Sequence, residues 1–157
     1  MGRGDIVDTL AQQCPETIAL LSSLSDGQAN YRYAPGKWSI KEMLGHVVDT
    51  ERIFAYRALR IARNDQTPIE GFEQDDYVRG ANFSECRLTD MLDEFAVVRR
   101  ASILLFQQLT PEAWLRHGTA SQMGISVRAV AYIIAGHEIY HRNALKEKYR
   151  SGAAAPA

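Results

Sequence analysis

The amino-acid sequence predicts an all-α protein folded as a four-helix bundle with long connecting loops, and three observations support this. Four long segments repeat apolar residues with the helical period. No stretch alternates apolar and polar residues in the manner of a half-buried strand. The chain has 157 residues, of which 46% are hydrophobic, which suits one compact domain with a single core. Long amphipathic helices without strands pack as a bundle.

The first predicted helix covers about residues 5–24 and carries apolar residues along one side. Pro15 lies in its middle, and we expect a break or kink there because proline lacks the amide hydrogen and clashes with the preceding turn. The second helix begins after Ser39, a good N-cap, and Glu42 three residues later completes a capping box. Its apolar stripe continues to about Asn64, where we expect the helix to end.

The third predicted helix covers about residues 88–109, and the fourth covers about residues 127–149 with Ser126 as its N-cap. A long connection of residues 64–85, rich in turn residues and carboxylates, joins the second helix to the third. Residues 111–125 join the third helix to the fourth. Connections of this length in a compact domain are often functional, so they are where a site could be covered.

Composition and charge argue against several classes of function. The net charge of −1 gives no electrostatic argument for a nucleic acid or an anionic membrane as partner. No apolar run approaches the roughly 20 residues that span a bilayer. The N-terminus lacks a signal-peptide stretch, so we expect a cytoplasmic protein. Cys14 and Cys86 stand alone and are expected to be reduced, buried thiols. We assign residues 1–150 to one domain and residues 151–157 to a disordered tail.

The segment GHEIYH near the end of the chain has the form H-E-x-x-H, with which zinc proteases place two ligands and a general base on one helix. His137 and His141 are four residues apart, so they stack on one face of the fourth helix, and we expect both imidazoles to point into the bundle. The same face holds Val130, Ile134 and Leu145. This spacing brings two nitrogens to one metal ion, although a pair of satisfied core histidines fits it equally well.

The surroundings of the motif argue against a zinc protease. Proteases of this class have a third metal ligand downstream of the motif, whereas only 16 residues follow His141 and none of them is a histidine. Glu147 lies too close on the same helix to converge on the same ion. The strands that usually hold an extended peptide beside such a helix are also missing.

A third metal ligand must therefore come from upstream, where His46 and His117 are the candidates. His117 lies beside Gly118 in a loop and is expected to be solvated or to line a rim. His46 lies at the edge of the apolar stripe of the second helix, from which it can reach an adjacent helix. Three histidines from two helices leave coordination positions open, which is typical of a catalytic metal site and not of a structural one.

Two charged residues interrupt the apolar faces of the helices. Glu51 falls in the stripe of the second helix and Arg99 in that of the third, and a buried charge needs a partner. We expect these two to form an ion pair that fixes helix register, or Glu51 to accept a hydrogen bond from a metal-bound histidine or water. Glu51 is also the candidate general base. Glu138 lies beside the histidines, where a solvated glutamate is favoured over a supporting role.

Several short motifs occur in a specific order, namely Trp38-Ser39, His46-x-x-Asp49-x-Glu51 and Gly136-His137-x-x-x-His141. They resemble the DinB-like superfamily, the DNA-damage-inducible helical-bundle proteins with a three-histidine metal site. The resemblance covers nearly the whole chain, including residues 71–83, which look like that family's loop over the metal pocket. It implies that His46, His137 and His141 are metal ligands. Where the family has a further histidine before the last helix, this chain has Ala120.

The resemblance implies a metal-dependent enzyme that acts on a small molecule, either a hydrolase or a thiol-dependent S-transferase. Relatives bind a divalent transition metal such as zinc or nickel, and some use a low-molecular-weight thiol as cosubstrate. The alternative is a non-catalytic stress-response module that binds a metal or a small ligand, and a third possibility is a polar core network without metal. Tyr77 and Asn82 are candidates for the pocket wall. A homodimer is compatible with the resemblance.

Overall fold

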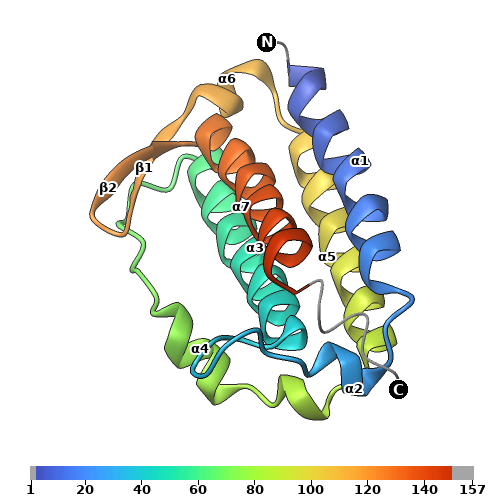
Figure 1. Ribbon diagram of the computed structural model, residues 1–157. Helices are drawn as coiled ribbons and strands as arrows, with labels where there is room; N and C mark the ends of the chain where they lie inside the picture. The colour runs from blue at the N-terminus through green and yellow to red at the C-terminus, as the bar shows by residue number, and fades with distance from the viewer. Residues whose placement is uncertain (1–2, 150–157) are drawn as a thin grey trace.

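Four long helices pack as a bundle, as the sequence predicts (Figure 1). The computed structural model describes residues 3–149. The long helices are α1 (Arg3–Leu21), α3 (Ile40–Ala62), α5 (Leu88–Gln107) and α7 (Val127–Lys148). Helix α1 packs against α5 and α7, and α3 packs against the same two helices. Hence α1 and α3 stand at opposite corners of the bundle.

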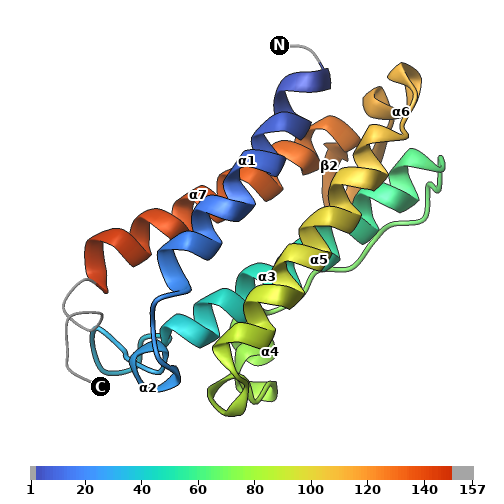
Figure 2. The same ribbon diagram turned by 90° about the vertical axis from the view of Figure 1, so that its right-hand side faces the viewer.

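The directions of the helices explain the longest connection. Helices α1 and α7 run in one direction, and α3 and α5 run in the other (Figures 1 and 2). Because α3 and α5 are parallel neighbours, the chain between them must return along the whole bundle. This return segment, residues 63–87, contains the short helix α4 (Gln74–Gly80) and the 3-10 turn η1 (Phe83–Glu85). It brings α4 to the end of the bundle at which α3 begins.

The helix boundaries follow from caps that are visible in the sequence. Ser39 and Glu42 form both hydrogen bonds of a capping box at the start of α3, and the Ser126 hydroxyl caps α7. Of the break or kink expected at Pro15, the break does not occur, because α1 continues as one helix through this position. A proline removes one intrahelical hydrogen bond, and the buried side chains of Leu10 and Leu21 anchor α1 before and after that position.

Two short β-strands form a hairpin that the sequence did not predict. β1 (His117–Ala120) and β2 (Met123–Ser126) pair antiparallel, and Ile69 of the return segment forms a bridge with Ala120. Strands of four residues are too short to show a clear alternating pattern. The turn residues Ser121 and Gln122 have φ angles of 50° and 64°, and neither is glycine, so the usual glycine signal of a tight hairpin is missing. The remaining short elements are α2 (Asp26–Ala29) and α6 (Pro111–Leu115).

The hydrophobic core divides into two clusters along the bundle axis. One cluster contains Leu10 and Phe106, and the other contains Leu44 and Phe95. Between them every long helix contributes at least one buried polar side chain, and we call this group the polar layer. Its members are Gln13, Thr17, Glu51, Arg99 and Glu138.

Further expectations from the sequence concern the two cysteines, membrane spans and the C-terminal tail. Cys14 is buried and Cys86 is half-buried, and both are free thiols. None of the helices within residues 3–149 combines the length and the hydropathy that a membrane span requires. The tail predicted for residues 151–157 lies outside the described residues.

The return segment is held against α3 by an aromatic side chain of η1. An ideal β-carbon placed on Gly45 would lie 2.4 Å from ring atoms of Phe83, so the ring occupies space that only glycine leaves open. Gly45 directly precedes His46 in α3. The contact therefore fixes the return segment beside a candidate metal ligand.

Replacing Gly45 by alanine should lower the free energy of unfolding by about 1–3 kcal/mol, because the added methyl group collides with the Phe83 ring. Gly136→Ala is the matched control, since a β-carbon there would meet no atom within 4 Å. That change should leave stability unchanged or raise it by up to about 1 kcal/mol. Urea denaturation of both variants measures the difference, and equal effects would contradict the packing of Phe83 on α3.

Candidate metal centre

Three histidine rings meet where α3 and α7 pack against each other. His46 comes from α3, and His137 and His141 come from successive turns of α7. The Nε2 atom of His137 lies 3.0 Å from Nε2 of His46 and 3.1 Å from Nε2 of His141. One ring nitrogen from each residue lies within 4.8 Å of the other two. The structure thus brings together the three histidines that the sequence singled out.

The donor set fits a single metal ion. Two nitrogens bound to one tetrahedral zinc ion at about 2.0–2.1 Å lie roughly 3.3 Å apart, close to the separations observed here. The alternative of a purely hydrogen-bonded cluster is less favourable, because each neutral imidazole has only one N–H to share and the three Nε2 atoms face one another. A cation between them would bind all three lone pairs.

Electrostatics keep the rings neutral near pH 7. Burial, aided by the neighbouring His137, lowers the pKa of His46 to about 4. Burial also lowers the pKa of His141 to about 3, and the other two histidines act in the same direction. The pKa of His137 is lowered by burial as well, although the negative charge of Glu51 opposes this. Neutral imidazoles have the free lone pairs that metal binding requires.

Neighbouring side chains hold the His46 ring in place. The Thr50 hydroxyl oxygen lies 3.4 Å from Nδ1 of His46. Because Nε2 faces the other two rings, the proton of neutral His46 belongs on Nδ1, where this oxygen can accept it. The indole of Trp38 covers the same imidazole, with ring centroids 4.7 Å apart. Together the two residues fix both the tautomer and the orientation of the ring.

A cavity of about 440 Å³ opens beside the histidines. His137 and His141 form part of its wall, and the N-terminal end of α4 supplies Gln74 and Asp75. The other residues that line it come from the loop before α3, from the start of α3 and from the end of α7. They are Tyr33, Gly36, Lys37, Trp38, Met43, Tyr140, Ala144, Lys148 and Tyr149.

Three further residues considered from the sequence lie away from this cavity wall. Tyr77 lines a different cavity, beside Phe72 and Tyr56. Asn82 precedes η1 and is not among the residues that line the metal-side cavity. His117 is exposed on β1 and does not belong to the group of three histidines, in agreement with the expectation of a solvated ring.

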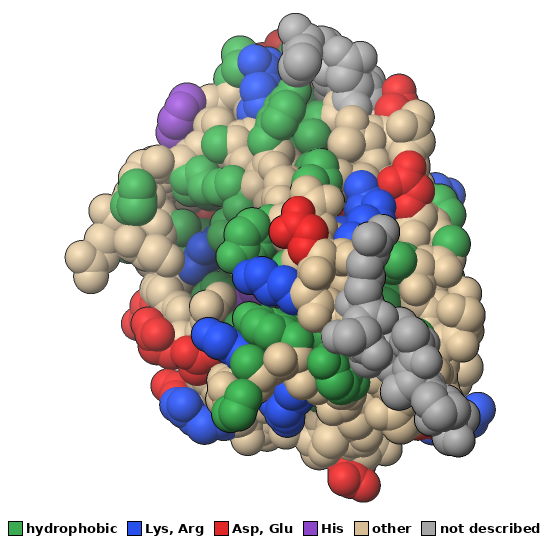
Figure 3. Space-filling view, in the orientation of Figure 1, with side chains coloured by type: hydrophobic (Ala, Val, Ile, Leu, Met, Phe, Trp, Pro, Cys, Tyr) green, Lys and Arg blue, Asp and Glu red, His purple; other side chains and the backbone are tan. Residues whose placement is uncertain are grey.

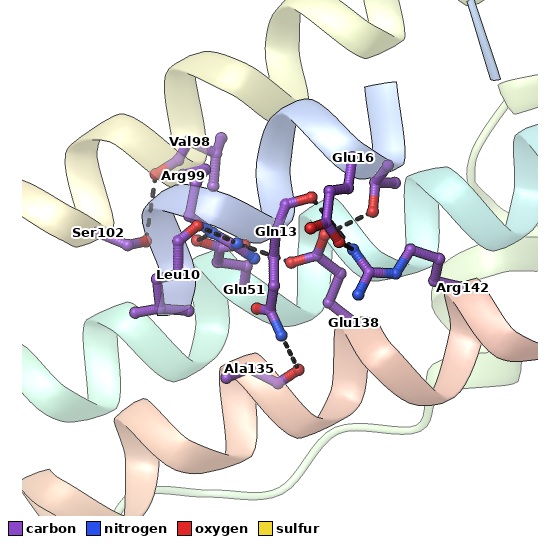
Figure 4. Close-up of polar contacts among 11 residues, drawn as sticks. Leu10, Gln13, Glu16, Glu51, Val98, Arg99, Ser102, Ala135, Glu138 and Arg142 are labelled. Carbon is purple, nitrogen blue, oxygen red and sulfur yellow. Dashed lines mark hydrogen bonds and ion pairs between the residues drawn. The ribbon is translucent and has the colours of Figure 1, made fainter. Parts of the chain in front are cut away.

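Behind the histidines, Arg99 is bound by two carboxylates (Figure 4). Its Nε and Nη2 atoms each donate a hydrogen bond of 2.9 Å to Glu51, which confirms the predicted ion pair. Its Nη1 atom donates to the carbonyl oxygen of Leu10 and lies 2.7 Å from Oε2 of Glu138. All three charged side chains are at most 2% exposed. Although burial opposes it, the two carboxylates raise the pKa of Arg99, so the guanidinium stays charged.

The position of Glu138 corrects the sequence interpretation, which favoured a solvated side chain. Glu138 is buried and accepts a 2.6 Å hydrogen bond from the Thr17 hydroxyl. The apolar stripe of α7 is centred on Ile134 and Ala135, so Glu138 one turn later faces the core. His137 and His141 lie at the edge of this stripe and are half-buried, facing α3 and the cavity.

The contacts of Glu51 bear on its candidacy as general base. Both of its carboxylate oxygens accept hydrogen bonds from Arg99, and it does not line the cavity. This geometry favours a supporting role for Glu51, whose negative charge pairs with Arg99 in the polar layer. Among the described residues that line the cavity, Asp75 is the only carboxylate. The sequence contained no signal that set Asp75 apart from the other acids of the return segment.

Comparison with known proteins places these features in a family. A model of the DinB superfamily matches residues 9–145. A protein of Bacillus pumilus named "Putative metal-dependent hydrolase" is 22% identical over 138 residues, which cover 86% of this chain and 78% of that protein. A second protein with this name, from Oceanobacillus iheyensis, is 27% identical over 70 residues, which cover 44% of this chain and 38% of that protein.

Two solved structures share the fold. YfiT from Bacillus subtilis, described as "a probable metal-dependent hydrolase with an unusual four-helix bundle topology", aligns with a TM-score of 0.86 at 13% identity, covering 95% of this chain and 86% of YfiT. The DinB-like protein YjoA from the same organism aligns with a TM-score of 0.67 at 20% identity, covering 94% of this chain and 90% of YjoA.

Replacing Arg99 by methionine should lower the free energy of unfolding by about 3–5 kcal/mol, because it leaves two buried carboxylates without their cation. The neighbouring Arg100 is exposed on the same helix, so Arg100→Met should change stability by less than about 0.5 kcal/mol. Denaturant unfolding of both variants gives the comparison. Similar losses in the two variants would show that the buried ion pairs do not stabilise the bundle.

The lowered histidine pKa values predict how the metal-free protein responds to acid. Below pH 6.5 the unfolded chain takes up protons on its histidines, whereas folded His46 and His141 stay neutral until about pH 4 and pH 3. Stability should therefore fall as the pH is lowered from 6.5 to 4, by up to about 1.4 kcal/mol per pH unit for each ring. Unfolding curves with a chelator present measure this slope, and His141→Gln should reduce it. An unchanged slope would contradict the burial of the ring.

Proposed function

Because the chain belongs to the DinB superfamily, we propose that it is a metal-dependent hydrolase acting on a small molecule. His46, His137 and His141 would hold one divalent transition metal, with zinc or nickel as the leading candidates. The observation that carries this proposal is the convergence of three Nε2 atoms beside a cavity that two of the three histidines line. The names of the two curated relatives support the reaction class.

A metal held in this way would act as a Lewis acid and would lower the pKa of the nucleophile that it binds. The three imidazoles are neutral, so they leave the double positive charge of the ion uncompensated within its own ligand set. Three protein ligands also leave coordination open, as in catalytic zinc sites. His137 and His141 are half-buried and line the cavity, which supports an open coordination position on that side.

The cavity supports a small molecule as the substrate. A volume of about 440 Å³ lies within the usual range of pockets for small ligands. Trp38 and Tyr149 give it aromatic surface against which the substrate can pack, and Asp75, which also lines it, is the candidate proton acceptor. Glu51 would act indirectly, by keeping the polar layer behind the metal ligands ordered.

Water is the nucleophile that this proposal assigns. A low-molecular-weight thiol in the same place would make the protein an S-transferase, and the same residues would serve both reactions. A turnover assay with and without the thiol distinguishes the two reactions, because only the transferase requires the thiol.

Protein purified without chelators or an affinity tag should contain about one divalent metal per chain by elemental analysis, and it should hydrolyse activated esters. His141→Ala should lose the metal and reduce turnover on the order of 100-fold or more, because a site with two ligands binds the ion poorly. His117→Ala is the control, since this exposed ring lies outside the group of three. It should match the wild type in both measurements.

Equal turnover by the wild type and His141→Ala would remove the proposal of metal catalysis. Metal bound without turnover of any ester, with or without a thiol, would identify a binding module. Turnover that depends on an added thiol would assign the S-transferase reaction in place of hydrolysis.

A further inference from the structure

Two lysines line the same cavity, and neither has an acidic partner among the residues that the structure describes. Lys37 precedes α3 and Lys148 ends α7, and both line the cavity. Two other cations near this end of the bundle are paired: Lys41 binds Asp26, and Arg32 binds Glu42. Within residues 6–149, no carboxylate oxygen lies within 4.0 Å of either Lys37 or Lys148.

The two lysines belong to segments that are fastened to each other. The Tyr149 hydroxyl donates a 2.7 Å hydrogen bond to the carbonyl oxygen of Trp38, so the end of α7 is tied to the loop before α3. The Tyr33 ring packs edge-on against Tyr149, with centroids 4.9 Å apart. Arg32 donates a 2.8 Å hydrogen bond to the carbonyl oxygen of Lys37 itself. The backbone positions of both lysines are thereby fixed relative to the cavity.

An aromatic side chain of the cavity wall holds the positive charge of Lys148 in place. The Lys148 ammonium lies 5.6 Å from the centroid of the Tyr33 ring, a cation–π contact that holds the charge over the cavity wall. The lining also includes Trp38, Tyr140 and Tyr149. Low-dielectric walls of this kind focus the field of the charges that they carry. Figure 3 shows Lys and Arg side chains among hydrophobic ones on the face that α7 forms.

The charges around the cavity are predominantly positive. The described residues that line it include two lysines, Lys37 and Lys148, and one carboxylate, Asp75, and the proposed metal would add two further positive charges. A neutral ligand gains little from this arrangement, and a cationic ligand is repelled by it. An organic anion with an aromatic or apolar body matches both the charge and the wall.

We propose that the substrate of the metal site is a small organic anion whose negative group, a carboxylate or a phosphate, is bound by Lys37 and Lys148. The apolar body of the substrate packs against Trp38 and Tyr149, and its reacting group faces the histidines. This proposal rests on the metal-dependent function above, since it names the class of molecule that the same site takes. Lys37 and Lys148 are specificity-determining residues and do not take part in the chemical step.

Cobalt(II) and two matched probes test the proposal on the full chain. Cobalt(II) bound by three histidines gives visible absorption that changes when a hydroxamate joins the ion. The probes are 4-carboxybenzohydroxamate and 4-carbamoylbenzohydroxamate, which share a metal-binding group and a ring and differ only in one negative charge. Each is titrated against the cobalt-loaded wild type and variants at low and high salt.

The wild type should bind the carboxylate probe about tenfold more tightly than the amide probe, and salt should reduce this preference. Lys37→Ala and Lys148→Ala should each reduce the preference by about threefold, and the double variant should abolish it. Lys146→Ala is the control, because this exposed lysine lies on the same helix and does not line the cavity. It should keep the full preference.

The failure of this proposal can be told apart from failure of the metal site. Equal binding of the two probes to the cobalt-loaded wild type would overturn the anionic substrate and leave the metal site standing. A preference that survives in the double lysine variant would overturn the role of the two lysines. Cobalt that binds equally to wild type and His141→Ala would overturn the metal site, and this proposal with it.

Discussion

The rest of the structure depends on one buried guanidinium. Arg99 from α5 holds Glu51 of α3 and Glu138 of α7, and it also donates to a carbonyl oxygen of α1, so a single side chain touches all four helices. These bonds fix how far each helix is shifted along the bundle axis. Glu138 directly follows His137, and Glu51 lies little more than one turn after His46. If one helix slid along the bundle axis far enough to separate the charges, the histidines would separate as well. The ion pairs and the candidate metal centre therefore require the same relative positions of the helices.

The topology explains why the cavity has walls from distant parts of the chain. Parallel packing of α3 and α5 forces the return segment along the bundle, and this path carries α4 with Asp75 to the end where the histidines lie. The Phe83 ring packs on Gly45 and holds the return segment beside His46. Tyr149 ties the end of α7 to the loop before α3, and both segments line the cavity. A bundle with short hairpin connections would have no chain available to build these walls.

Some of these features could be predicted from the sequence and others could not, and the difference has physical reasons. Periodicity and the caps at Ser39 and Ser126 are local signals, so the long helices were predicted closely. The need of each buried charge for a partner predicted the pairing of Glu51 with Arg99. Glu138 was misjudged because a helical wheel gives a face only to within a fraction of a turn, and the stripe of α7 is centred closer to Glu138 than to the histidines. Residues that meet only through the tertiary path of a loop, such as Asp75, have no local signature.

The charges on the two sides of the histidines differ in sign. Behind them the polar layer contains two carboxylates and one guanidinium, all buried, and within the described part of the chain Arg99 is the only cation within 4.0 Å of either carboxylate. In front of them, the cavity lining that the structure describes includes two lysines and one carboxylate. A buried excess charge costs stability unless a counter-charge lies nearby. A divalent cation between the three Nε2 atoms would supply that counter-charge and leave positive charge facing the cavity. The polar layer therefore favours the same ion that an anionic substrate would need.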